Sequence, residues 1–182
     1  MNSVPTFNAP VSRLKQPPRI YYVHPLQLRG YDAWAEVFEH AHSLGFDTVL
    51  TAPLFERGNH TSVFVSRTFD RIDPVLQLGD DIEGTFSQLA ALAANHQVRL
   101  MVDLVIDRNA REDGEDDNIV ADPRTPPDAN CSQVLDLSAS QSTYRYLEEW
   151  RQRVGALVDA GVAGFRCLGI GHVPEEAWAT LI

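Results

Sequence analysis

The chain has 182 residues, of which 15 are Lys or Arg and 25 are Asp or Glu, so its formal net charge at pH 7 is −10. This length suits a single domain with its own core, and the 44% apolar content excludes a mostly disordered chain. The acidic balance argues against nucleic acid or an anionic membrane as a partner, because phosphate groups would be repelled. A neutral polar ligand such as a sugar remains compatible with this charge.

The sequence predicts no membrane-spanning helix and no signal peptide. No apolar run approaches the roughly 20 residues that a membrane helix needs, and the first 18 residues lack the apolar stretch of a signal peptide. The two cysteines, Cys131 and Cys167, show no CxxC spacing, which predicts small buried residues with free thiols. We therefore expect a cytoplasmic protein.

Strand and helix patterns alternate along the chain. Residues 1–18 are proline-rich and show no periodicity, which predicts an arm or linker before a folded domain over residues 19–182. Short β-rich runs predict strands at 19–23, 48–52, 98–106 and 165–168. Apolar residues at helical spacing predict four helices: 32–44 with Asp32 as N-cap and Leu44 on the apolar face, 81–95, 143–160 with Val158 on the apolar face, and one beginning at Pro174.

This order predicts an α/β fold with parallel strands and right-handed crossovers. Two long polar connections, at 53–80 and 107–141, both follow strands rather than helices. Because strand-to-helix loops form the functional face of such folds, the asymmetry indicates a barrel-type enzyme scaffold.

Three segments resemble motifs of the α-amylase family of glycoside hydrolases and transferases. Residues 69–74 (FDRIDP), followed by Gly79, resemble the run before that family's second helix. Residues 103–107 (DLVID) are similar to its strand-three motif, and residues 164–168 (GFRCL), followed by His172, are similar to its strand-four motif. The likeness covers about residues 19–182, and within the family it looks greatest to bacterial maltosyltransferases that use maltose 1-phosphate.

The resemblance implies a (β/α)8 TIM barrel, which typically needs about 250 residues. This chain is expected to hold an N-terminal arm and about four βα units, so the barrel would be truncated halfway round. The two strands that carry the family's general acid and third carboxylate would lie outside it.

The resemblance also implies a chemistry that this chain does not support. Retaining glycosidases need a nucleophile and a general acid whose carboxyl groups lie about 5 Å apart. The family's nucleophile is an Asp two positions after the strand-four Arg, and that position is Leu168 here. An isobutyl group can neither attack a sugar carbon nor stabilise a positive charge, so we expect no catalytic residue in this chain.

Four residues are candidates for substrate binding by their family counterparts: Asp103, Arg166, His172 and Phe64. Asp103 and Arg166 are expected to form an ion pair, whose alternative role is to tie strand three to strand four. His172 could instead be a structural residue in the first turn of the last helix, and Phe64 could pack into the core.

No metal and no cofactor are expected. Asp107 stands where the family often has an Asn that helps to bind calcium, but Arg108 replaces the usual His and would disfavour a cation. The acidic run at 112–117 lacks the order of a calcium-binding loop and is interpreted as a solvated loop.

Three hypotheses follow. The first is a catalytically inactive domain of the α-amylase lineage, a pseudoenzyme with a structural, glucan-binding or regulatory role in α-glucan metabolism. The second is the N-terminal half of an active hydrolase or maltosyltransferase that further sequence or another subunit completes. The third is an unrelated βα-barrel enzyme, such as an isomerase or aldolase. For an open half-barrel, the expected partners are an α-glucan or maltooligosaccharide, and either the remaining half-barrel or a second copy of the chain.

Overall fold

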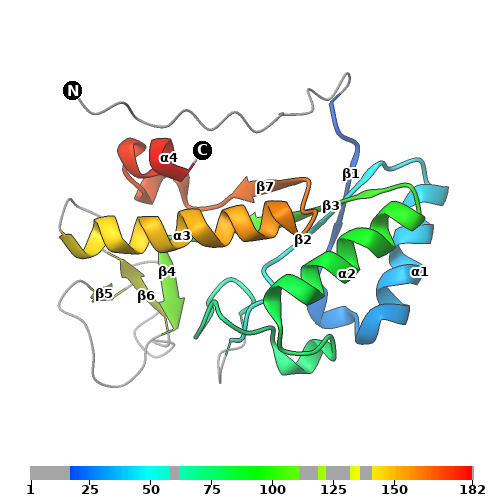
Figure 1. Ribbon diagram of the computed structural model, residues 1–182, viewed down its shortest axis with the longest axis horizontal. Coiled ribbons are helices and arrows are strands. Elements are labelled where there is room, and N and C mark those ends of the chain that lie inside the picture. The colour runs from blue at the N-terminus through cyan, green and yellow to red at the C-terminus, as the bar shows by residue number, and fades with distance from the viewer. Residues whose placement is uncertain (1–16, 58–61, 111–118, 122–131, 136–140, 182) are drawn as a thin grey trace.

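The computed structural model describes residues 17–57, 62–110, 119–121, 132–135 and 141–181. Four strands form one parallel sheet in the order β1-β2-β3-β7: β1 (Ile20–Val23), β2 (Thr48–Thr51), β3 (Arg99–Leu104) and β7 (Gly164–Cys167). The order of these strands in the sheet follows their order in the chain (Figure 1). Parallel neighbours require crossover connections, and the arrangement confirms an α/β fold of about four βα units.

Helices follow each of the four strands. They are α1 (Gly30–Ser43), α2 (Ile82–Asn95), α3 (Gln141–Asp159) and α4 (Glu175–Leu181). Asp81 caps α2, where its carboxylate accepts a hydrogen bond from the Gly84 N–H at 2.9 Å. This cap satisfies one of the amide groups that a helix leaves unpaired at its N-terminus, which is why α2 begins where the sequence predicts.

The predicted start of the first helix is wrong. α1 begins at Gly30, and its N-cap residue, Arg29, makes no side-chain capping bond. Asp32, the predicted N-cap, lies instead in the first turn, where its negative charge interacts favourably with the helix dipole.

Two residues assigned to buried helix faces are exposed. Leu44 is 57% exposed because it is the C-cap of α1 and lies beyond the last turn that packs on the sheet. Val158 is 48% exposed because its neighbour Leu157, only 2% exposed, occupies the direction that faces the core. Consecutive helical residues point about 100° apart, so both cannot face inward.

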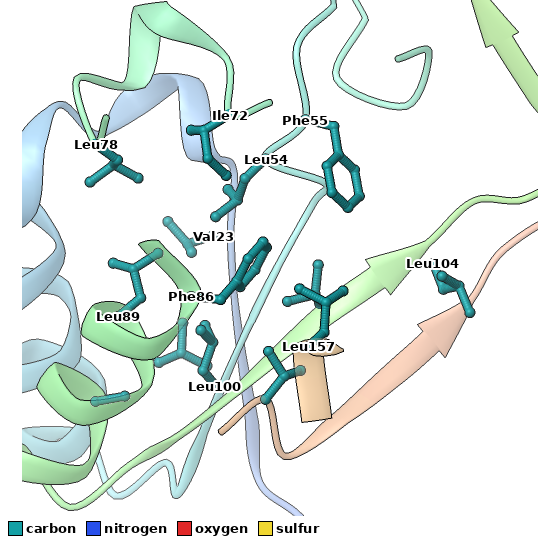
Figure 2. Close-up of a cluster of buried hydrophobic side chains, with 14 of the residues drawn as sticks. Val23, Leu54, Phe55, Ile72, Leu78, Phe86, Leu89, Leu100, Leu104 and Leu157 are labelled. Carbon is teal, nitrogen blue, oxygen red and sulfur yellow. The ribbon is translucent and has the colours of Figure 1, made fainter. Parts of the chain in front are cut away.

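The helices pack against one face of the sheet. The strand residues on that face join helix residues in one buried cluster, which includes Val23, Val49, Leu100, Val102 and Leu104 from strands and Trp34, Phe38, Phe86 and Leu89 from helices. Figure 2 shows Val23 and Leu100 beside Phe86 and Leu89 of α2. Burial of each such side chain stabilises the fold by about 1.5–3 kcal/mol.

The opposite face of the sheet, here called the inner face, carries the alternate strand residues. Tyr22, Leu50 and Met101 lie in register across β1, β2 and β3, and Asp103 and Arg166 lie two residues further along β3 and β7. None of these five residues belongs to the helix-side cluster. Successive side chains of a strand point to opposite faces of the sheet. One face therefore packs against the helices, and the other carries the polar side chains of Tyr22, Asp103 and Arg166.

The connection between β2 and α2, predicted to be polar, contributes to the core. It contains a short 3₁₀ helix, η2 (Pro74–Leu76), and the buried apolar residues Leu54, Phe55, Val63, Val65, Ile72, Leu76 and Leu78. Phe69, half-buried in this connection, packs edge-on against Trp150 of α3 with ring centroids 4.7 Å apart. Most of this segment has no regular secondary structure, so its apolar residues follow no repeating period. The sequence pattern therefore did not reveal that they are buried.

The connection between β3 and α3 contains a second sheet that the sequence did not predict. Its strands, β4 (Arg108–Ala110), β5 (Ile119–Ala121) and β6 (Ser132–Leu135), are antiparallel in the order β4-β6-β5. Strands this short give too few alternations to be recognised in a sequence. The acidic run at 112–117, Cys131 and most of the predicted arm lie outside the described residues.

Among the described residues, no helix combines the length and the apolar character needed to cross a membrane.

Candidate functional site

The inner face holds the predicted ion pair. Asp103 of β3 and Arg166 of β7 are register partners, and the Arg166 Nε and Nη2 atoms donate to the two Asp103 carboxylate oxygens at 2.6 and 2.7 Å. The Asp103 side chain is fully buried, whereas the Arg166 side chain is 45% exposed. Two parallel charge-assisted hydrogen bonds fix a guanidinium more firmly than a single contact does. The pairing predicted from the sequence is therefore confirmed.

Tyr22 of β1 joins this pair, which the sequence did not predict. The Arg166 guanidinium carbon lies 5.0 Å from the centre of the Tyr22 ring, within the range of a cation–π contact. Burial and the nearby Asp103 charge raise the pKa of the Tyr22 phenol, and Arg166 partly opposes the shift, so the phenol is protonated at neutral pH. The sequence did contain a signal for this contact. Side chains alternate between the two faces of a strand, and this alternation places Tyr22 of β1 on the same face as Asp103 and Arg166.

Leu168 directly follows β7 at the carboxyl end of the sheet. Its N–H donates to the Leu104 carbonyl oxygen at 2.9 Å, so the backbone continues along β3 beyond the last residue of β7. The side chain is half-buried and apolar. The position that the family resemblance assigns to a nucleophile is thus ordered, but it offers no group that can react.

Asp107 and Arg108 form a second ion pair at the same end of the sheet. The Arg108 Nε and Nη2 atoms lie 3.0 and 2.9 Å from the two Asp107 carboxylate oxygens, and the Asp107 side chain is fully buried. Gly169 lies against this carboxylate in a left-handed conformation (φ +68°), and an added Cβ would come within 2.6 Å of an Asp107 oxygen. The Arg108 guanidinium therefore contacts both Asp107 oxygens, which are the atoms that a metal cation would need as ligands. The described residues contain no cluster of His, Cys, Asp and Glu suited to a metal ion.

Contacts from other elements hold this end of β3 in place. The Tyr146 hydroxyl of α3 donates to the Ile106 carbonyl oxygen at 2.8 Å, and the Ala110 N–H donates to the Ser66 carbonyl oxygen at 2.8 Å. Burial raises the pKa of the Tyr146 phenol well above its usual range, so the hydroxyl keeps the proton that it donates.

The other two candidate residues are not joined to the Asp103–Arg166 pair. Phe64 is half-buried in the β2–α2 connection, where its N–H donates to the Ser62 hydroxyl at 3.2 Å. His172 is exposed at the end of a 3₁₀ helix, η4 (Ile170–His172), and precedes α4. The alternative that placed it in the first turn of the last helix is therefore wrong, because Val173, in the extended conformation that a following proline favours, separates η4 from α4.

Cys167 also differs from its prediction. It lies in β7 and is only partly buried, beside the exposed Arg166. Its burial is nevertheless sufficient to raise the pKa of the thiol.

Comparison with known proteins identifies a sequence relative. No protein-family profile matches the chain. Its sequence is 27% identical over 179 residues to an alpha-1,4-glucan:maltose-1-phosphate maltosyltransferase of Burkholderia pseudomallei (strain K96243). The match covers 91% of this chain and 16% of that enzyme, so the chain spans a small part of the relative's length.

Several solved structures share the fold. A maltogenic alpha-amylase from Thermotoga neapolitana has a TM-score of 0.68 at 18% identity, over 89% of this chain and 41% of that one. An alpha-amylase from Lactobacillus plantarum has a TM-score of 0.65 at 18% identity, over 88% and 40%. A cyclomaltodextrinase has a TM-score of 0.66 at 16% identity, over 90% and 36%. The chain therefore has the fold of about four βα units of an α-amylase-type TIM barrel, and its sequence resembles part of an alpha-1,4-glucan:maltose-1-phosphate maltosyltransferase.

Proposed function

We propose that this chain is a domain of α-glucan metabolism that binds glucan but does not itself transfer glycosyl groups. The observation that carries the proposal is Leu168, which stands directly after β7 where the resemblance places the nucleophile. A retaining mechanism needs a carboxylate there to form the covalent intermediate and to offset the charge of the transition state.

The neighbouring carboxylates are poor substitutes for the missing nucleophile. Both oxygens of Asp103 accept hydrogen bonds from Arg166, and both oxygens of Asp107 lie within 3.0 Å of Arg108 nitrogens. A carboxylate held in this way has its lone pairs directed at a guanidinium and its side chain buried. Attack on a sugar carbon would require breaking the pair, which is costly in a buried setting.

The Asp103–Arg166 pair remains suited to binding a sugar. The Arg166 side chain is 45% exposed while its carboxylate partner is buried, so we expect its N–H groups that Asp103 leaves free to reach hydroxyl groups of a ligand. We assign further glucan contacts to Phe64, through its aromatic face, and to His172, which is exposed after β7. The relatives support this ligand class, because their names specify a glucan maltosyltransferase and a maltogenic amylase.

The second candidate is a part of an active, cytoplasmic α-glucan hydrolase or maltosyltransferase. It is favoured by the 16% coverage of the maltosyltransferase and by the two outer strands of the sheet, β1 and β7, each of which has a single neighbour among the described strands. In that case the acid-bearing strands would come from further sequence or another subunit, and Leu168 would still need a substitute.

An activity assay tests the first candidate. The purified chain, Leu168→Asp and Leu168→Asn would be incubated with maltooligosaccharides and with maltose 1-phosphate, and products would be resolved by chromatography. We expect no turnover by the unmodified chain and measurable binding of a maltooligosaccharide by calorimetry. Turnover above a buffer control would overturn the proposal, and Leu168→Asn controls for the change in polarity without supplying a nucleophile.

The two outer strands, β1 and β7, each have a single neighbour among the described strands, which leads to a further expectation for the isolated chain. Ile20 and Tyr22 of the outer strand β1 are 39% and 42% exposed. Unpaired strand edges and exposed apolar side chains favour association with another copy. Light scattering in the micromolar range is expected to show dimers or larger species, and a stable monomer would contradict this.

A further inference from the structure

The contact between Tyr22 and Arg166 joins the two outer strands of the parallel sheet. β1 and β7 are separated by β2 and β3, and neighbouring strands lie about 4.8 Å apart. The two side chains nevertheless meet, with 5.0 Å between the guanidinium carbon and the ring centre. They must therefore lean towards each other across the inner face, over both central strands.

Residues beneath this contact are covered on the inner face. Leu50 of β2 lies in register with Tyr22, and its side chain is only 3% exposed although it is not part of the helix-side cluster. Burial of this kind is expected for a residue below side chains that cross the face. Tyr22 and Arg166, at 42% and 45% exposed, form the outer layer above it.

We infer that Tyr22 is a positioning residue that sets the plane of the Arg166 guanidinium on the inner face. Asp103 holds one edge of the guanidinium through Nε and Nη2. A bidentate pair along one edge leaves the group free to tilt about that edge. The ring of Tyr22, placed over the guanidinium, removes this freedom.

The consequence is a preorganised donor for a ligand. Because Asp103 engages Nε and Nη2 and the Arg166 side chain is 45% exposed, we expect a ligand to approach the guanidinium from its Nη1 side. The pair is charge-balanced and the chain carries a net charge of −10, so a neutral ligand rich in hydroxyl groups suits it better than an anion. This ligand class rests on the proposed function, whereas the role of Tyr22 in holding Arg166 does not.

The test uses variants that separate the ring from the hydroxyl. In Tyr22→Leu the ring is lost, and in Tyr22→Phe it is kept. Hydrogen exchange of the Arg166 Nε–H, followed by NMR, is expected to become about 2- to 5-fold faster in Tyr22→Leu. It should change less in Tyr22→Phe, which keeps the ring and loses only the interaction of the hydroxyl with Arg166. Tyr144→Leu, at a site 70% exposed on α3, is the control and should leave the rate unchanged.

Binding of a maltooligosaccharide is the second readout. Its affinity is expected to fall by a similar factor in Tyr22→Leu and to be unaffected in Tyr144→Leu. An Arg166 exchange rate unchanged in Tyr22→Leu would overturn the inference. Absence of glucan binding by the unmodified chain would overturn the proposed function, and the exchange data would still decide the role of Tyr22.

A reciprocal variant covers the case in which Tyr22→Leu does not fold. Arg166→Lys keeps the positive charge but lacks the planar group, so the ring resonances of Tyr22 are expected to shift. Arg153→Lys is the matched control, because Arg153 lies 5.7 Å from the ring centre of Phe69 and does not contact Tyr22. Tyr22 resonances that are unchanged in folded Arg166→Lys would equally overturn the inference.

Discussion

The two ends of the parallel sheet use the same kinds of charged residue in different surroundings. At the amino end, Asp47 accepts hydrogen bonds from the side chains of Arg19, Thr48 and Arg99, and its side chain is 34% exposed. At the carboxyl end, Asp103 and Asp107 are fully buried, and each pairs with one arginine through two contacts.

The difference shows which contacts serve stability and which constrain a site. Exposed ion pairs contribute little, because water screens them and their side chains lose entropy. Buried pairs gain little net energy over apolar residues, but breaking one leaves an uncompensated charge. The carboxyl end therefore depends on the pairing of its buried charges, whereas the amino end does not.

Loss of one member of a buried pair should have the largest effect. Arg166→Met leaves Asp103 buried without its cation and should lower the free energy of unfolding by about 3 kcal/mol, the lower end of the range because Arg166 is partly exposed. Urea unfolding at neutral pH measures this. The double variant Asp103→Leu/Arg166→Met should be closer to the unmodified chain, and a single variant as stable as the double one would contradict the comparison.

A smaller loss of stability is expected from a substitution at Gly169, whose backbone lies against the buried carboxylate of Asp107. Gly169→Ala introduces a Cβ in a left-handed conformation and within 2.6 Å of an Asp107 oxygen, which should cost about 2 kcal/mol. Gly171→Ala is the matched control, because nothing lies within 4 Å of its Cβ position. Thermal unfolding that shifts equally in both variants would show that the close approach does not matter.

The amino end should respond weakly and in a defined pH range. Burial raises the pKa of Asp47, but hydrogen bonds from Thr48, Arg99 and Arg19 outweigh it and lower the pKa from 3.8 to about 2. The ionised form is therefore favoured in the folded state, and its contribution is lost as the pH falls from about 4 to about 2. Asp47→Asn should lose at most about 1 kcal/mol at pH 6, because the side chain is partly exposed. The loss should be much smaller at pH 2, close to the folded-state pKa. A loss that is independent of pH would be inconsistent with this assignment.

The smallest effect is expected on the surface of α3. Arg151 donates to Glu148 at 2.7 Å and lowers the pKa of Glu148 to about 2, yet both side chains are nearly half exposed. Glu148→Gln should leave the urea unfolding midpoint unchanged, because solvent screens the pair. A loss as large as that of Asp47→Asn would show that the short distance matters more than burial.

Much of the fold could be predicted from the periodicity of apolar residues and from the residues that begin and end helices. The run VRLMVDLVI contains β3, and Asp81 caps α2 where it was expected. Asp103 and Arg166 could be paired because the resemblance placed them on neighbouring strands. The burial of Phe55 and Ile72 could not be predicted, because irregular segments bury apolar residues without a repeating period. The strands β4 to β6 could not be predicted because three or four residues give too few alternations to be recognised.

By itself the sequence determined the order of the four strand–helix units, the apolar side chain at Leu168 and the acidic net charge, because these depend on residue identity and local spacing. Only the tertiary structure decided three contacts. Tyr22 packs against Arg166, Arg108 pairs with Asp107, and Gly169 lies against the Asp107 carboxylate. Two of these contacts, Tyr22 with Arg166 and Asp107 with Gly169, join residues far apart in the chain. The pairing of Asp107 with the adjacent Arg108 depends on the burial of Asp107. Such details follow from register and packing, which local propensity does not encode.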